Sequence, residues 1–328
     1  MAAEPLLTAL PCHRMARYTG HHRWWRPVLG LLLLLTGLAV AFLVIDAVVH
    51  AAGPAAGMRE LPDGSMRLGE RGATAMGLLF IASLLPLVLL AVRWPGRRPA
   101  GTVSSVTGRL RWRWLGWCLA AAVPAVAVLA LVVVLVPFDD TSGVAAEPDQ
   151  WVGWSSFAVS MTVVALCVPF QAAAEEYVFR GWMMQAVGGF LHSPWFAVVP
   201  QAVLFAAAHG WGTVWGFADL CVFGLVTGCL TVRTGGLEAA IALHVLNNLL
   251  GYGLAATVVG GLTGAETAAD SPVLLAVVDM AVIVLYGALV LWLARRHRPQ
   301  RISASAPRPV AMPPYPTVPL PGIRVVRP

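Results

Sequence analysis

Long apolar runs dominate this chain, separated by shorter segments that hold most of its charged residues. A helix that crosses a bilayer needs about 20 mainly apolar residues. The pattern therefore predicts an all-α fold, a polytopic transmembrane helical bundle with about eight spans, of which the fifth is the shortest. The predicted spans cover residues 27–49, 74–92, 115–136, 153–182, 194–209, 214–232, 237–259 and 272–294.

Changes in composition along the chain predict four parts. Residues 1–26 form a basic N-terminus, and residues 27–151 hold three spans. Residues 152–294 form a second group of spans that contains ionisable side chains. Residues 295–328 are rich in proline and cannot bury a core, so we expect a disordered tail.

Composition and charge agree with a membrane protein. The chain is 58% hydrophobic and 12% charged, with a mean hydropathy of +0.75. All 22 basic residues are arginine; fifteen of them flank one side of the predicted bundle, and three lie in the opposite loops. The positive-inside rule then places both termini on the cytoplasmic side of the membrane. We expect this membrane to be a bacterial plasma membrane. We expect no nucleic-acid binding, because no soluble segment is long enough to form a basic surface.

Residues 175 to 180 place three ionisable side chains inside an apolar run. On insertion scales a charged residue at a helix centre costs about 2.5 to 3.5 kcal/mol, so these side chains predict an internal site. Glu176 and Arg180 are four residues apart and can pair on one helix face. Glu175 is rotated from them by roughly 100°, and this unpaired carboxylate is our candidate general base.

Two further motifs each place a histidine four residues from a second residue of interest. Phe205 and His209 share one helix face, and so do His244 and Asn248. A single histidine within a span is as often a packing hydrogen bonder as a catalytic group. Two Glu, one Arg, two His and an amide in one region instead indicate a functional site. Asn247 lies on a different face, where we expect a supporting role at most.

These motifs, in this order, resemble those of the CPBP intramembrane proteases. That family, also called Abi, contains the CAAX prenyl endopeptidases and bacteriocin-processing proteins. The resemblance covers roughly residues 152 to 259, and the first three spans and the tail carry nothing that matches. The motifs are Glu175-Glu176-x-x-x-Arg180, Phe205-x-x-x-His209 and His244-x-x-x-Asn248.

The resemblance implies proteolysis within the membrane. In that family the first glutamate of the pair, here Glu175, activates a water together with the first histidine, here His209. The second histidine and the asparagine, here His244 and Asn248, complete the site or hold the oxyanion. Peptide hydrolysis needs a water activator and donors for the developing negative charge, so the residue types suit this chemistry. The supporting residues would be Glu176, Arg180 and Phe205.

Whether a metal takes part stays open at this point. If zinc is present, its ligands would be His209, His244 and either Glu175 or Glu176. The HExxH helix of many zinc peptidases is absent, and Arg180 is expected to occupy Glu176. We therefore expect no cofactor, with zinc as the alternative.

Residue counts from the span ends test whether the motifs lie at one depth. At 1.5 Å per residue, His244 lies about 10 Å from the start of its span, and Glu175 about 13 Å from a boundary at Met184. His209 lies about 22 Å along a helix that begins at Ser193–Pro194. This mismatch indicates that the fifth span is tilted, begins outside the hydrocarbon, or has a different boundary.

The expected partners are a peptide or membrane-protein substrate and the lipid bilayer. Prenylated proteins are chiefly eukaryotic, whereas the all-arginine, Ala- and Gly-rich composition is typical of a GC-rich bacterial genome. We therefore do not take prenylated proteins as the expected substrate. The sequence predicts no oligomeric state.

Two other classes of function remain. A non-catalytic membrane scaffold or immunity-type partner could keep every motif residue. A proton-coupled transporter also uses intramembrane Glu and His, but no internal repeat is visible between the halves. Asp219 and Asp279 are expected to be packing hydrogen bonders, with Asp219 a minor candidate for lining the site. The motif Gly224-x-x-x-Gly228 predicts close helix packing.

Overall fold

A computed structural model gives the fold of residues 9–55, 57–62, 65–135, 150–264 and 267–304. Every named element within these ranges is a helix, which confirms the predicted all-α class. The α-helices are α1 (Trp25–Ala52), α2 (Glu70–Ala82), α3 (Leu84–Arg93), α4 (Trp112–Leu135), α5 (Trp154–Glu176), α6 (Met184–Gly188), α7 (Trp195–Ala208), α8 (Val214–Thr234), α9 (Glu238–Ala255) and α10 (Val273–His297). The 3-10 helices are η1 (Cys12–Arg17), η2 (Ala100–Val103), η4 (Gly261–Thr263) and η5 (Ala268–Asp270), and η3 (Tyr177–Met183) is a π-helix. Most of the predicted Pro-rich tail lies outside the described residues.

Six helical stretches in the described part of the chain are long and apolar enough to cross a membrane. They are α1, α2 with α3, α4, α5 with η3 and α6, α8, and α10. The other two predicted spans are also helices, but α7 has only 14 residues, and α9 has 18 residues that include Glu238, His244 and two asparagines. About eight spans is therefore an approximation. The described residues thus form six stretches of spanning length and the two further helices α7 and α9.

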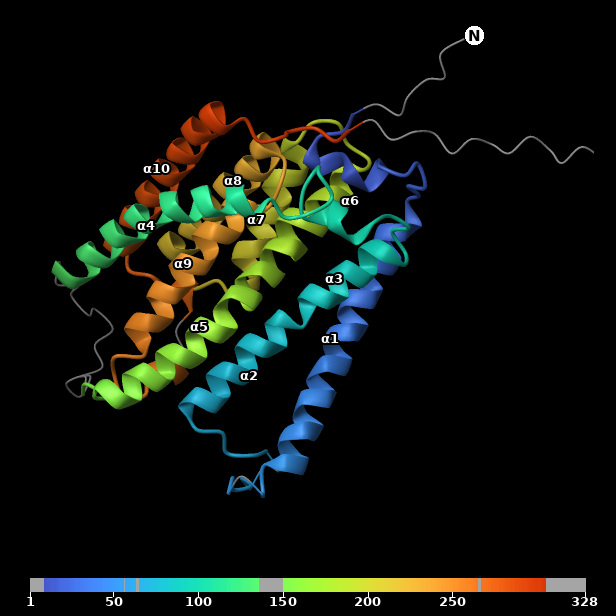
Figure 1. Cartoon of the computed structure of the whole chain (residues 1–328). Helices are drawn as coiled ribbons and strands as arrows, with labels where there is room; N and C mark the ends of the chain where they lie inside the picture. The colour runs from blue at the N-terminus through green and yellow to red at the C-terminus, as the bar shows by residue number, and fades with distance from the viewer. Residues whose placement is uncertain (1–8, 56, 63–64, 136–149, 265–266, 305–328) are drawn as a thin grey trace, which may run out of the picture.

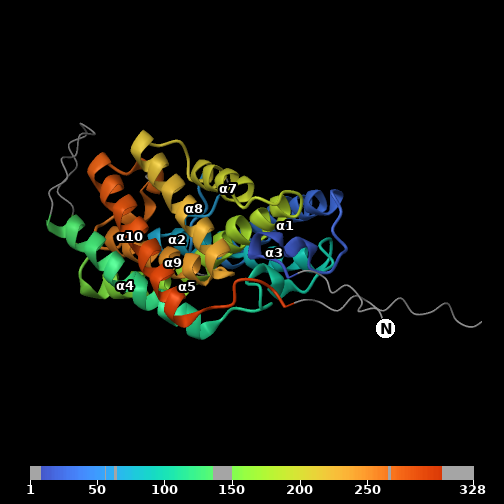
Figure 2. The same ribbon diagram turned by 90° about the horizontal axis from the view of Figure 1, so that it is seen from above.

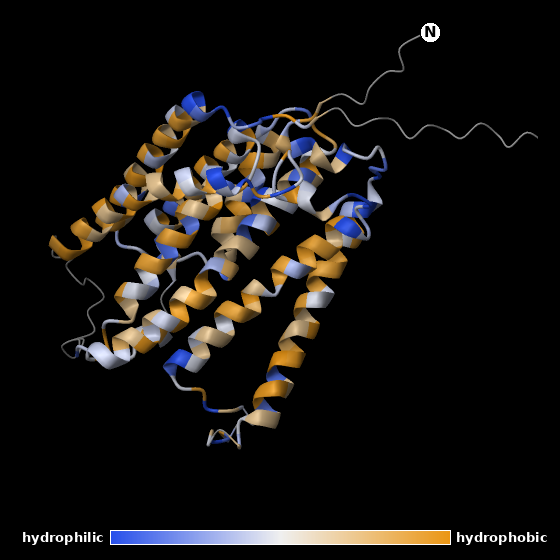
Figure 3. Cartoon of the chain, in the orientation of Figure 1, coloured by the Kyte–Doolittle hydropathy of each residue, from blue (hydrophilic) through white to orange (hydrophobic). Residues whose placement is uncertain are grey.

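Helix α9 lies in the middle of the bundle, where it contacts α4, α5 and α8 (Figures 1 and 2). Helix α10 covers α4 and α8, and α7 lies along α8. Helix α1 lies at the edge and contacts mainly α3, as Figure 1 shows. It is apolar along most of its length (Figure 3), and many of its large apolar side chains are exposed; Leu43, for example, is 63% exposed. This exposed apolar surface suits contact with lipid tails.

A buried ion pair fixes the start of α9. The side chain of Glu238 is fully buried and accepts hydrogen bonds from the backbone N–H and the guanidinium of Arg111. Arg111 Nη2 lies 2.6 Å from Glu238 Oε2, and Arg111 also donates to the carbonyl oxygens of Thr234 and Gln300. A buried carboxylate is stable only when it is paired and hydrogen-bonded. The contact therefore anchors the helix that carries His244.

The two ends of the described chain lie together. The backbone N–H of Ser303 donates to Leu10 O, and Leu10 N–H donates to Ser303 Oγ. Element η1, which follows Leu10, packs on α6, and its Cys12 side chain is fully buried. Burial raises the pKa of the Cys12 thiol to about 12, so it stays protonated. The predicted basic N-terminus is thus partly a folded cap on the bundle.

The predicted close packing at Gly224 and Gly228 is confirmed. A Cβ on Gly224 would lie 2.6 Å from the Cα of Ala202 on α7, and a Cβ on Gly228 would lie 2.8 Å from Gln201 Nε2. Gln201 Nε2 in turn donates to the carbonyl oxygen of Gly224 at 2.8 Å. This contact holds α7 beside α8, and α7 carries the Phe205 and His209 motif.

We predict that Gly224→Ala destabilises the protein by about 1 to 3 kcal/mol, because the added methyl would push α7 away from α8. Gly77→Ala is the matched control, since a Cβ there meets no atom within 4 Å. It should be neutral or stabilise α2 by up to about 1 kcal/mol. Thermal unfolding in detergent measures both. Equal stability of the two variants would contradict the packing argument.

Candidate active site

The Glu-Glu pair ends α5 and is followed by seven residues of π-helix. Short π segments in α-helices are rare and often mark functional sites. Across this turn Arg180 Nη1 lies 3.0 Å from Glu176 Oε1, and both side chains are fully buried. The predicted pairing is therefore present. Glu175 points away from it, as the helical rotation predicts.

Arg180 also explains the phenylalanine of the second motif. Its guanidinium carbon lies 4.0 Å from the centre of the Phe205 ring and 5.2 Å from that of Phe223. The two rings stack on each other at 5.5 Å. A desolvated guanidinium over aromatic faces is stabilised by about 2 kcal/mol. Phe205 thus packs against the Arg180 guanidinium, and it lies one helical turn before His209.

His244 connects the two glutamates. Its Nδ1 lies 2.7 Å from Glu176 Oε1, and its Nε2 lies 3.5 Å from Glu175 Oε2. In neutral His244, donation from Nδ1 to Glu176 leaves a lone pair on Nε2. This lone pair faces the second oxygen of Glu175.

His209 approaches Glu175 from the end of α7. Its Nδ1 is 2.9 Å from the carbonyl oxygen of Phe205, an acceptor, so Nδ1 carries the proton. Its Nε2 lies 3.9 Å from Glu175 Oε2, and in the neutral ring this atom has a lone pair. The His209 side chain is 24% exposed, which makes it the most open of the three groups. Three acceptor atoms thus converge: Glu175 Oε2, His209 Nε2 and His244 Nε2.

Gln171 is a site residue that the sequence analysis missed. Its Nε2 donates to Glu175 Oε1 at 2.7 Å, and its Oε1 accepts from Asn248 Nδ2 at 2.9 Å. Gln171 precedes Glu175 by four residues, the same spacing that revealed the other pairs. Asn248 therefore reaches Glu175 through Gln171. One oxygen of Glu175 is held by this chain, and Oε2 has no hydrogen-bond partner among the described residues.

The helical stretch that carries Glu175 continues to Gly188, four residues beyond the boundary at Met184 from which its depth was counted. The three motif residues meet in spite of their different counts, because His209 Nε2 and His244 Nε2 lie 3.9 and 3.5 Å from Glu175 Oε2. Counts from the helix ends therefore do not share one zero for these three helices.

Residues 153–250 match the family model described as type II CAAX prenyl endopeptidase Rce1-like. This part of the chain is similar to that family. The match agrees with the predicted resemblance to CPBP proteases, and the Rce1-like segment contains all seven predicted site residues. It covers α5 through most of α9 and leaves out α1 to α4 and α10.

One curated relative is a Bacillus subtilis (strain 168) protein named uncharacterized protein YyaK. It is 29% identical over 175 residues, which cover 50% of this chain and 55% of the relative. The aligned part therefore spans about half of each protein. No solved structure matches the chain.

Two carboxylates outside the group around Glu175 lie close together. Asp219 on α8 is a neighbour of Asp279 on α10, and Asn247 lies beside Asp279. Asn248 instead donates to Gln171, so the two adjacent asparagines have different neighbours.

Possible metal donors in the Rce1-like site are the same three converging atoms. Each histidine Nδ1 is already hydrogen-bonded, which leaves each Nε2 facing Glu175. Within the described residues, no group of three His, Cys, Asp or Glu side chains is arranged to hold a metal ion.

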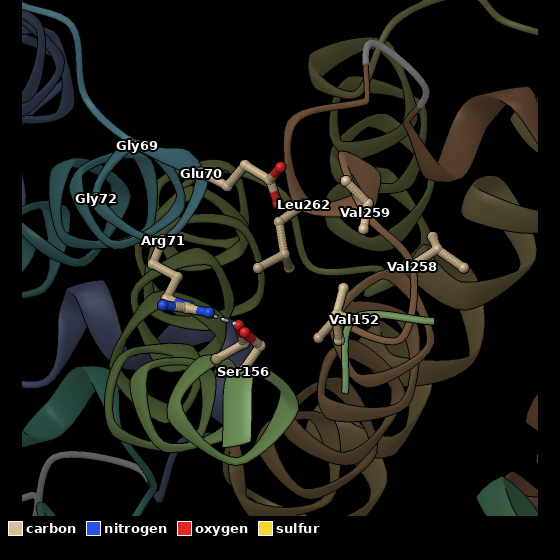
Figure 4. Close-up of a pocket in the computed structure, with 11 residues that line it drawn as sticks. Gly69, Glu70, Arg71, Gly72, Val152, Ser156, Val258, Val259 and Leu262 are labelled. Atoms are coloured by element: carbon tan, nitrogen blue, oxygen red, sulfur yellow. Dashed lines mark hydrogen bonds between the residues drawn. The ribbon is translucent and has the colours of Figure 1, made fainter. Parts of the chain in front are cut away.

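A polar pocket of about 370 Å³ lies at the other end of α5 (Figure 4). Glu70 and Arg71 of α2 line it, together with Ser156 and Ser160 of α5. Arg71 Nε donates to Ser160 Oγ at 3.1 Å. Ser160 precedes Glu175 by fifteen residues, or about 22 Å of helix, so this pocket is separate from the Rce1-like site.

We predict that Arg180→Ala lowers stability by roughly 3 to 5 kcal/mol, because it leaves Glu176 buried with only His244 as a partner. Glu176→Gln combined with Arg180→Ala should recover part of this loss. Arg67→Ala, at an exposed arginine, should change stability by less than about 0.5 kcal/mol. Thermal unfolding in detergent tests all three variants. A double variant as unstable as the sum of its singles would show that the charges are not coupled.

Proposed function

We propose that this chain is an intramembrane endopeptidase that hydrolyses peptide bonds with a glutamate-activated water. The Rce1-like match supports a peptidase at the family level. The observation that carries the mechanism is the convergence of Glu175 Oε2, His209 Nε2 and His244 Nε2. A water has two protons to donate, and two of these atoms, Glu175 Oε2 and His209 Nε2, can accept them.

In this mechanism Glu175 is the general base. The water oxygen attacks the scissile carbonyl carbon while Glu175 Oε2 takes one of the water protons. His209 Nε2 accepts the other O–H and orients the water. Glu175 then gives its proton to the leaving amine nitrogen as the carbon–nitrogen bond breaks. Gln171 holds the other carboxylate oxygen at 2.7 Å, so Oε2 remains directed at the water.

Asn248 is the proposed donor to the developing oxyanion. An asparagine amide has two N–H groups, and the bond to Gln171 uses one of them. The second can donate to substrate. In a site with little water, such a donor is worth about 2.7 to 4 kcal/mol in the transition state. His244, held at 2.7 Å by Glu176, completes the site.

The proposed substrate is a peptide or a membrane-protein segment that reaches the site from the bilayer. The matched family is named for prenyl substrates. The residues around Glu175 need only a peptide bond, so we do not extend the prenyl requirement to this chain. The proposed location is the bacterial plasma membrane, with both termini in the cytoplasm.

A non-catalytic scaffold and a proton-coupled transporter are the competing functions. A scaffold needs the buried Glu176 and Arg180 pair but has no use for an oriented oxygen on Glu175 that accepts no hydrogen bond from a described residue. A transporter would require Glu175 to exchange protons between the two sides of the membrane. Both rivals predict that no peptide accumulates when Glu175 is changed.

We predict that Glu175→Gln abolishes hydrolysis while the protein still folds, because the amide keeps the shape and removes the base. Glu70→Gln is the control, since Glu70 lies in the separate pocket. Peptides that accumulate in cells without the protein identify the substrate, which is then tested with purified variants. Near-normal turnover by folded Glu175→Gln protein would remove the base assignment. The absence of any accumulating peptide would favour the scaffold.

A further prediction concerns metal. For a glutamate base without zinc, elemental analysis of active protein should find well under one equivalent, and mild chelation should leave activity intact. His209→Ala should lose activity that added metal does not restore. Suppose instead that each chain holds one zinc tightly, that chelation removes zinc and activity together, and that added zinc restores the activity. His209, His244 and a glutamate would then be its ligands.

A further inference from the structure

A second cluster of charged side chains lies at the start of α1, away from the proposed active site. His22 lies close to Arg17, Arg23, Arg26 and Arg98, and no carboxylate of the described residues is among its charged neighbours. Burial and these four arginines lower the pKa of His22, so it is neutral at neutral pH. The cluster thus has a strong positive charge that no described side chain balances.

Arg98 is the buried member of this cluster. It is 5% exposed, and burial lowers its pKa to about 10, so it remains protonated near pH 7. Its Nη1 donates to Gln185 Oε1 at 2.5 Å and to Thr102 Oγ1 at 2.9 Å, both neutral acceptors. A buried cation without a counter-charge is strongly unfavourable, so this position favours an anion.

Unused donors surround the same space. A small cavity of about 30 Å³ is lined by His22, Arg26 and Arg98. Neither His22 Nε2 nor Arg26 Nε has a hydrogen-bond partner among the described residues, although both atoms are buried. Arg26 also lies close to Arg97 and Arg23, and its Nη1 donates to the carbonyl oxygen of Pro95. Pro95 and Arg97 belong to the wall of a much larger groove.

That groove runs between α1 and α3 and has a volume of about 590 Å³. Its walls are apolar, and Arg97 lies at the end nearest the basic cluster. Along α1 it extends from Trp25 to Gly37, which is about 18 Å and close to the thickness of one leaflet of the bilayer core. Leu29 and Leu32, on its wall, are 45% and 53% exposed.

We propose that an anionic phospholipid binds here, with its phosphate on the basic cluster and one acyl chain in the groove between α1 and α3. The groove opens where α1 faces lipid, so a hydrocarbon chain is its natural occupant. The arginines and the unused His22 and Arg26 donors then select a negative headgroup. Two tryptophans at this end, Trp25 and Trp94, lie where the headgroup layer favours aromatic rings.

The test compares lipids on the purified full-length protein. Native mass spectrometry in detergent should show tighter binding of dioleoyl phosphatidylglycerol than of dioleoyl phosphatidylcholine. Arg23→Gln combined with Arg97→Gln should weaken phosphatidylglycerol binding roughly thirtyfold, or about 2 kcal/mol for two interfacial arginines. Both side chains are exposed, so the fold should persist. Arg59→Gln with Arg67→Gln removes the same charge at the other end and should change binding by less than about twofold.

A second pair of variants tests the chain site. Thr36→Trp should fill the groove and weaken binding of the same lipid, whereas Leu35→Trp, on the neighbouring lipid-facing position outside the groove, should not. Equal binding of the two lipids, equal losses for the two arginine pairs, or no effect of Thr36→Trp would each overturn the proposal. So would inorganic phosphate competing as well as the lipid, because the cluster would then be an anion site without a chain.

Discussion

The buried carboxylate of Glu176 is the constraint on which the site depends. It is fully buried and accepts from both Arg180 and His244, two groups that come from different helical segments. A buried carboxylate requires such partners, so Glu176 draws η3 and α9 together. That contact turns His244 Nε2 toward Glu175, and Arg180 in turn packs against Phe205. Glu176, whose charge is balanced by Arg180, thus orients the groups that surround Glu175.

Much of this arrangement could be predicted because helical spacing acts over short distances. The pairing of Glu176 with Arg180 and the different direction of Glu175 follow from the geometry of one helix. The apolar runs likewise predicted the helices and their approximate ends. The order of the three motifs indicated the family over α5 to α9, the part that the Rce1-like match covers.

Other features depend on contacts between distant segments, and the sequence does not reveal these. The pairing of Arg111 with Glu238 joins residues 127 positions apart, and neither residue belongs to a motif. The direction of Asn248 depends on Gln171, 77 positions away. The continuation of α5 to Gly188 was missed because η3 and α6 carry no clear stop signal. Gln171 could have been predicted, because it lies four residues before Glu175 and so on the same helix face.

The π-helical turn also limits how this segment can change during evolution. A π turn holds one more residue than an α turn, and here it lies between the Glu175–Glu176 pair and α6. Loss of a single residue from Tyr177–Met183 would rotate α6 by about 100° relative to α5. Gln185 would then turn away from Arg98. A one-residue gap that an alignment treats as minor would thus disconnect the site helix from the N-terminal half of the protein.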